Sequence, residues 1–221
     1  MTEITNPEIL PDSKRKLSNR GIRKIIYRFP SLINKKSIDC EFGLDWKLCH
    51  LFELDHASIQ SYESQAHKMT YYVDKKKRSY TPDFLVNRSG TEIVVEVKPE
   101  KKVPDHLQKL QHVKAAYKLL EMQFVLITDT YIENQPRLDN AINILRHARQ
   151  QVTRTSLKAI VDLFKCCRTP LTIRAVVDQL SQKNVQEAEI YKLIYVGIIR
   201  FDPEKPLNRN SLIWFSTDVN A

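Results

Sequence analysis

The chain has 221 residues with 35 Lys and Arg against 26 Asp and Glu, a formal net charge of +9 and a sequence pI near 9.3. This length suits one medium domain and one small domain, and the positive charge favours an anionic partner, most commonly nucleic acid. The four glycines lack the spacing of a Gly-rich loop, which excludes the common nucleotide-binding motifs. The sequence has no CxxC pair, no signal-peptide pattern and no long apolar run. We therefore expect a soluble, cytoplasmic protein with no membrane partner.

Residues 1–36 are expected to form a basic, partly ordered arm. Between Ser13 and Lys36 the chain has nine basic residues and no acidic one. Such a run can follow a phosphate backbone, and a solvated flexible arm is the alternative. The interleaved apolar residues favour partial folding. The residues expected to contact DNA from this arm are Lys14, Arg15, Lys16, Arg20, Arg23, Lys24 and Arg28.

The next segment, 37–54, is predicted to be one amphipathic helix. Leu44, Leu48 and Leu51 repeat at helical spacing, and Ser37 is a suitable N-cap. Glu41 then lies on the same buried side of the helix as the leucines. A carboxylate in that position needs a metal ion or a cation as a partner.

Short strands are expected at 70–73, 79–86 and 91–98, followed by a helix over 104–122, a strand over 124–128 and a helix over 136–149. A turn at 87–90 joins the second and third strands. This order predicts an α/β domain over 37–152, with a mixed sheet flanked by helices.

The last part of the chain, 153–221, has a different pattern. Three helices are predicted at 156–166, 172–180 and 186–196, and two strands at 198–201 and 211–215. Three helices followed by a β-hairpin is the order of a winged-helix domain. The third helix carries few basic residues, which favours protein docking over sequence reading by this domain.

The most informative residues lie in the predicted hairpin. If Asn87 pairs with Gly90, residue 83 faces residue 94, and Glu96 is the diagonal neighbour of Asp83 on the same face. Diagonal neighbours have Cα atoms about 7 to 8 Å apart, which allows two carboxylates to bind one divalent cation. Lys98 lies two residues beyond Glu96 and projects to the same face.

This arrangement predicts a Mg²⁺ site for phosphodiester hydrolysis. Hard cations prefer oxygen ligands, here Asp83, Glu96 and the carbonyl of Val97, with Glu41 as a further carboxylate. A water would be the nucleophile, and Lys98 would orient or deprotonate it. The alternative for Glu96 and Lys98 is an ion pair on a solvated strand face. Lys101 and Lys102 flank the site and are expected to hold DNA, whereas for 75–78 a solvated turn is an equal alternative.

These motifs resemble the PD-(D/E)xK nucleases of restriction-endonuclease-like fold and, within them, the TnsA family. The resemblance covers nearly all of the chain, including the winged-helix order. It implies catalytic roles for Glu41, Asp83, Glu96 and Lys98, with Glu53 as the alternative to Glu41. The segments that carry it are Ser37 to Glu41, Tyr62-Glu63-Ser64-Gln65, Tyr80-Thr81-Pro82-Asp83-Phe84, Val95-Glu96-Val97-Lys98-Pro99 and Ile127-Thr128-Asp129.

The resemblance further implies a transposase subunit that needs Mg²⁺, for which Mn²⁺ can substitute. Its expected partners are double-stranded transposon-end DNA, a TnsB-like DDE transposase that cuts the 3′ ends, and a TnsC-like AAA+ ATPase bound through the C-terminal domain. Cleavage of the 5′ ends would then give cut-and-paste transposition, and the small size suits a CRISPR-associated transposon. The alternatives are a stand-alone restriction or repair nuclease and a non-catalytic adaptor that binds DNA and proteins.

Overall fold

The computed structural model describes residues 3–10, 26–167 and 169–216. Contacts within the chain define two units, Met1–Glu133 and Asn134–Ala221. This division differs from the boundary expected at 152/153, because helix α4 (Arg137–His147) belongs to the second unit. The amide of Asn140 on α4 donates to the carbonyl of Lys205 and accepts from the backbone N–H of Leu207, which binds the helix to the C-terminal residues.

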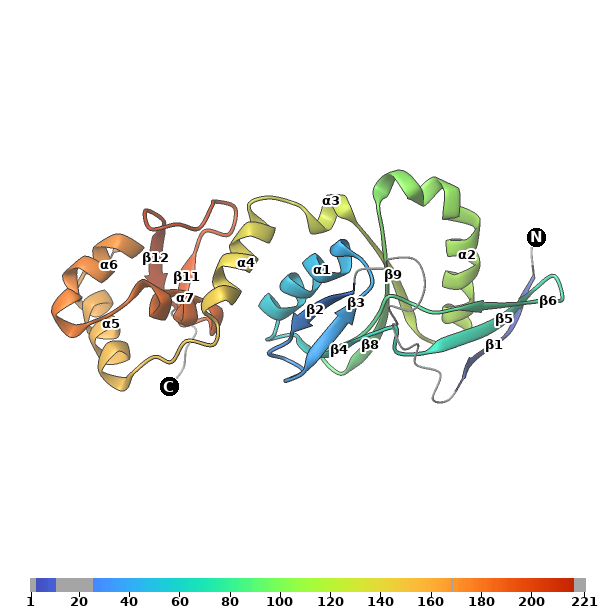
Figure 1. Cartoon of the computed structure of the whole chain (residues 1–221), viewed down its shortest axis with the longest axis horizontal. Helices are drawn as coiled ribbons and strands as arrows, with labels where there is room; N and C mark the ends of the chain where they lie inside the picture. The colour runs from blue at the N-terminus through green and yellow to red at the C-terminus, as the bar shows by residue number, and fades with distance from the viewer. Residues whose placement is uncertain (1–2, 11–25, 168, 217–221) are drawn as a thin grey trace. The chain divides into compact units, whose positions relative to one another are not determined.

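The first unit contains most of the strands (Figure 1). A four-stranded sheet in the order β4-β7-β8-β9 is antiparallel except for the parallel pair β8 and β9. Helix α2 connects this parallel pair. The mixed sheet with flanking helices confirms the expected fold class. The elements of the sheet and its helices are α1 (Gly43–Leu54), β4 (Ile59–Ser64), β7 (Phe84–Arg88), β8 (Thr91–Lys98), η1 (Glu100–Lys102), α2 (Val103–Leu119), β9 (Gln123–Thr128) and α3 (Asp129–Ile132).

Two smaller strand groups complete this unit. Strand β5 (Lys68–Val73) pairs with both β1 (Ile4–Leu10) and β6 (Lys76–Tyr80), and Figure 1 shows α2 beside this three-stranded sheet. Strands β2 (Tyr27–Pro30) and β3 (Ser37–Cys40) form an antiparallel pair that contacts α1. Strands β1 and β2 both lie within residues 1–36, the segment expected to be a basic arm.

The predicted helix over 37–54 is wrong at its start. Residues 37–40 form β3, in which Ile38 and Cys40 are buried and alternate with Ser37 and Asp39, the period of a strand. The helix begins at Gly43, after Phe42 in an extended conformation. Ser37 therefore caps no helix.

The predicted strand 79–86 is two strands that belong to different sheets. Strand β6 ends at Tyr80, β7 begins at Phe84, and Pro82 lies between them. Proline has no N–H to donate to a strand ladder, so the chain leaves one sheet at this point and enters the other. Asp83 therefore lies immediately before β7 and outside either strand.

Two cores cover the four-stranded sheet. Helix α2 packs Val113, Ala116 and Tyr117 against β5, β6 and Val94 of β8. Helix α1 packs Phe52 against the rings of Tyr62 and Phe84, with ring centroids 5.1 and 5.5 Å apart. The hairpin that carries the predicted site residues is thereby held between two helices.

In its described residues, the second unit contains α4, three further α-helices and one 3-10 helix beside a small antiparallel sheet in the order β10-β12-β11. The helices and the hairpin follow the predicted order, and the short strand β10 was not predicted. Its assignment as a winged-helix domain stays a prediction. The elements are α5 (Arg154–Cys167), β10 (Leu171–Thr172), α6 (Ile173–Gln179), η2 (Ser181–Lys183), α7 (Glu187–Tyr195), β11 (Ile199–Phe201) and β12 (Leu212–Phe215).

Candidate functional site

The β7–β8 hairpin places Asp83 opposite Glu96. Phe84 pairs with Val95 and Arg88 pairs with Thr91, so the loop consists of Ser89 and Gly90. Both loop residues have positive φ, 50° and 82°, as a type I′ hairpin turn requires. The predicted register, with residue 83 facing 94, is wrong by two residues, because it assumed that Asn87 pairs with Gly90. The observed register, continued by one residue beyond Phe84, places Asp83 directly opposite Glu96.

Glu96 is 4% exposed and has a partner at each carboxylate oxygen. The ammonium of Lys98 lies 2.6 Å from Oε1, and the hydroxyl of Tyr80 donates a short hydrogen bond to Oε2. The expectation that Glu96 and Lys98 lie side by side is confirmed. The alternative of a solvated ion pair is wrong for Glu96, because its carboxylate is buried.

Asp83 is fixed by the backbone on both sides. Its Oδ2 accepts a hydrogen bond from the N–H of Val97 at 2.7 Å, and its carbonyl accepts one from the N–H of Gln65 at 2.9 Å. Because Val97 follows Glu96 directly, this bond ties the Asp83 carboxylate to the Glu96 strand. The role predicted for the Val97 carbonyl as a metal ligand stays a prediction.

Asp45 is a site residue that sequence analysis missed. It lies in the first turn of α1, is 4% exposed, and its carboxylate accepts a hydrogen bond from the N–H of Phe42. The charges of Glu96 and Asp83 both interact with it. No local sequence signal identified it, because the helix start at Gly43 depends on the pairing of β3 with β2. In the observed helix, Asp45 adjoins the positive end of the helix dipole.

We call Asp45, Asp83 and Glu96 the carboxylate cluster. Burial raises the pKa of Asp45 to about 6, and the charges of Glu96 and Glu41 add to this shift. Burial, together with Glu96 and Asp45, raises the pKa of Asp83 well above its ordinary range. Burial lowers the pKa of Lys98, but Glu96 and the other two carboxylates outweigh it, so the pKa is raised and Lys98 is a cation. The charge of one ammonium therefore interacts with the charges of three carboxylates.

Glu41 lies outside the helix in which it was predicted. It precedes Phe42 in the short link between β3 and α1, where its Oε2 accepts a hydrogen bond from the side-chain amide of Gln65 at 2.9 Å. Its charge interacts with that of Asp45, which places it beside the carboxylate cluster. The prediction of a buried helical carboxylate thus applies to Asp45 rather than to Glu41.

Glu53, the alternative to Glu41, has a different environment. It is fully buried, and its carboxylate accepts hydrogen bonds from the hydroxyls of Ser31 and Tyr62 and from the N–H groups of Leu32 and Ile33, at 2.6 to 3.2 Å. Three of these donors belong to the link between β2 and β3, and the fourth, Tyr62, is on β4. The hydrogen bonds of the Glu53 carboxylate therefore stabilise this link.

The predicted DNA-binding residues are placed only in part. Lys14, Arg15, Lys16, Arg20, Arg23 and Lys24 lie outside the described residues. Arg28 is on β2 and forms an exposed ion pair with Asp39, with 3.6 Å between Nε and Oδ1. Lys101 and Lys102 are exposed in η1, which follows the strand that carries Glu96 and Lys98.

The donor set of the carboxylate cluster fits a divalent cation. Within residues 3–10, 26–167 and 169–216, no three His, Cys, Asp or Glu side chains lie close enough to hold a metal ion as they stand. The cluster nevertheless offers oxygen ligands, the kind that Mg²⁺ prefers, and an excess of buried negative charge. The Oε1 atom of Gln65 is also buried without a hydrogen-bond partner in the described part of the chain.

Comparison with known proteins identifies the segment that carries most of this site. Residues 56–129 match the family model of the TnsA-like endonuclease N-terminal domain, and no curated protein matches the chain. Asp83, Glu96 and Lys98 lie inside the matched segment, whereas Glu41 and Asp45 precede it. None of the helices in the described ranges has the length and apolar character needed to span a bilayer. Residues 56–129 are therefore similar to the N-terminal domain of TnsA-like endonucleases.

Proposed function

We propose that this chain is the metal-dependent endonuclease subunit of a transposase and hydrolyses phosphodiesters at the 5′ ends of the element. The observation that carries the proposal is the buried carboxylate of Glu96, which contacts the ammonium of Lys98 and lies on the strand whose Val97 N–H binds Asp83. The charge of Asp45 interacts with those of both other acids. Burial, and in addition repulsion from the neighbouring acids, raises the pKa values of Asp45 and Asp83, so a bound cation would offset an unfavourable charge. The match to a TnsA-like domain supports DNA as the substrate.

Asp45, Asp83 and Glu96 would hold the ion, with Glu41 near by. A divalent cation bound there supplies positive charge to the phosphate and to an attacking water. Tyr80 and Lys98 orient the Glu96 carboxylate, and the N–H of Val97 orients that of Asp83. Because Lys98 is a cation next to the cluster, its role would be to hold a phosphate oxygen and stabilise the charge that develops there.

The partners and the division of labour follow from the TnsA resemblance. A TnsB-like DDE transposase would cut the 3′ ends, and a TnsC-like ATPase would bind the second unit. Mg²⁺ is the proposed metal, with Mn²⁺ as a substitute, and the site residues are those of the carboxylate cluster together with Lys98.

The decisive experiment is reconstitution with candidate transposase and ATPase subunits, transposon-end DNA and Mg²⁺, followed by mapping of both strand ends. We expect a nick at the 5′ boundary of the element that disappears in Asp83→Asn and Lys98→Ala. Persistent cleavage in both variants would favour a non-catalytic adaptor. Efficient cutting of arbitrary duplexes by the chain alone would favour a stand-alone nuclease.

A further inference from the structure

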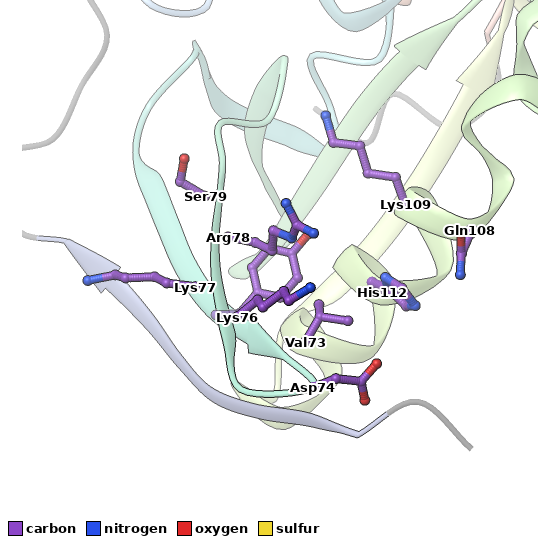
Figure 2. A pocket seen from close by; sticks show the side chains of 10 residues that line it. Val73, Asp74, Lys76, Lys77, Arg78, Ser79, Gln108, Lys109 and His112 are labelled. Atoms are coloured by element: carbon purple, nitrogen blue, oxygen red, sulfur yellow. The ribbon is translucent and has the colours of Figure 1, made fainter.

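A groove of about 740 Å³ lies between the β5–β6 hairpin and α2, separate from the carboxylate cluster (Figure 2). Strand register determines which side chains face it. Val73 pairs with Lys76, Tyr71 with Arg78 and Met69 with Tyr80, and the tyrosines and Met69 pack toward α2. Because side chains two apart share a face, Lys76 and Arg78 face α2 as Tyr80 does. Figure 2 shows Lys77 pointing away from the helix.

Both walls of the groove are basic. Helix α2 contributes Lys109 and His112, which are three residues apart and therefore share a helix face. Within the described ranges, no carboxylate lies within ion-pair distance of Lys76, Arg78 or Lys109. Among the described residues that line the groove, Asp74 is the only acidic one, and one of its oxygens accepts the N–H of Glu3. The groove thus presents cations whose charge is not neutralised.

Tyr80 connects this groove with the carboxylate cluster. The ammonium of Lys109 lies 5.4 Å from the centroid of the Tyr80 ring, a distance typical of a cation–π contact. The hydroxyl of the same tyrosine donates to Glu96. A single side chain therefore separates the basic wall of the groove from a candidate metal ligand.

We propose that this groove binds the phosphodiester backbone of duplex DNA on one side of the cleavage site; the inference rests on the nuclease function proposed above. Lysine and arginine on two walls suit consecutive phosphates, and contacts of this kind position a duplex without reading its sequence. Ser79 and Gln108 add neutral hydrogen-bonding groups to the lining. The groove would therefore hold the DNA in register with the carboxylate cluster.

The test is duplex binding by the full chain, measured with a fluorescent DNA of arbitrary sequence in EDTA over a range of salt concentrations. We expect the triple variant Lys76→Ala/Arg78→Ala/Lys109→Ala to lower the slope of log affinity against log salt by about 2 to 3, because each phosphate contact contributes about 0.9. At low salt this corresponds to roughly 100-fold weaker binding. The charge-preserving variant Lys76→Arg/Arg78→Lys/Lys109→Arg should retain the wild-type slope.

The matched control is Lys114→Ala/Lys118→Ala/Lys165→Ala, which removes three exposed lysines outside the groove and should leave the slope within one unit of the wild type. Equal slopes for the groove and control variants, no duplex binding by the wild type, or tighter binding of polyglutamate than of DNA would each overturn the inference. Asp83→Asn should abolish cleavage in the reconstituted reaction and keep the salt slope. If the wild type cuts DNA and the groove variant binds duplex DNA as the wild type does, the groove inference is wrong and the nuclease function stands. If binding depends on the groove but the wild type does not cut DNA, the nuclease function is wrong and the groove inference stands.

Discussion

The hydroxyl of Tyr80 donates a hydrogen bond to Glu96, and the ring of Tyr80 is packed against Tyr117 and Phe124. The ring fixes the position of the hydroxyl, and the hydroxyl fixes one oxygen of a candidate metal ligand. Tyr80 is thus a positioning residue that links the core under α2 to the carboxylate cluster.

Tyr80→Phe removes this donor and keeps the packed ring. We expect cleavage in the reconstituted reaction to fall by about 10- to 100-fold, the range typical of partners that orient metal ligands. The loss should be concentrated in the apparent metal affinity and be partly restored by a higher Mn²⁺ concentration. The control is Tyr117→Phe, since the Tyr117 hydroxyl lies in the same core and bonds His67 instead. An equal loss in both variants would show a packing effect rather than positioning.

The contribution of Asp45 to the stability of the metal-free protein is expected to fall as the pH rises from about 4 to 7. The pKa of Asp45 is raised from 3.8 to about 6 in the folded state. Within this window the folded protein holds a proton that the unfolded chain has released, so the free energy of unfolding decreases with rising pH. Above the folded pKa the charged, buried carboxylate costs up to roughly 3 kcal/mol.

Asp45→Asn should remove this cost and keep an acceptor for the N–H of Phe42. In EDTA, we expect the variant to be more stable than the wild type at pH 7.5 and nearly equal to it at pH 4, as measured by urea unfolding. Asp39→Asn, which alters an exposed ion pair, should change stability by less than about 1 kcal/mol at either pH. An Asp45→Asn variant that is less stable at pH 7.5 would contradict the assignment of a destabilising charge.

The sequence pattern predicted which residues of the hairpin come together better than it predicted their register. The strands and helices from residue 91 onward agree closely with the structure, because each has a clear period and a clear stop. Asp83, Glu96 and Lys98 also share one hairpin, so local spacing was enough to bring them together. Two predictions were wrong. The register of the β7–β8 hairpin depends on the positive φ of Ser89, and the predicted strand 79–86 is interrupted at Pro82.

The helical carboxylate could not be assigned from local pattern. The apolar residues of 37–54 fit a helix, but Ile38 and Cys40 are buried through pairing of β3 with β2, a partner that the pattern does not reveal. Moving the helix start from residue 37 to Gly43 replaces Glu41 by Asp45 as the inward carboxylate. A tertiary contact therefore determined which acid joins the cluster.

Cleavage assays should distinguish the roles of Asp45 and Glu41. Asp45→Asn is expected to lower activity in the reconstituted reaction by about 100-fold or more, beyond the range typical of groups that only orient ligands. Glu41→Gln should retain its contact with Gln65 in amide form and lose at most about tenfold. The reverse order of effects would restore Glu41 as the essential carboxylate. Both variants should unfold cooperatively, as checked by circular dichroism.

Addition of Mg²⁺ should raise the melting temperature, and more so at pH 7.5 than at pH 5. Ion binding requires deprotonated carboxylates, and the raised pKa values of Asp45 and Asp83 make this costly at low pH. The shift should vanish in Asp83→Asn and in Glu96→Gln, as measured by differential scanning fluorimetry with and without EDTA. An equal shift at both pH values would place the ion elsewhere.

Glu53 should be important for stability rather than for metal binding. Replacing it by Gln leaves four donors around a group that can no longer accept from all of them, so we expect a loss of about 2 to 4 kcal/mol in urea unfolding. Glu63→Gln, at a half-exposed carboxylate on the neighbouring strand, should cost less than about 1 kcal/mol. Because the Glu53 carboxylate accepts its hydrogen bonds largely from the link between β2 and β3, the Mg²⁺-dependent rise in melting temperature should persist in Glu53→Gln. A stable Glu53→Gln protein without that rise would instead make Glu53 the metal carboxylate and remove Asp45 from that role.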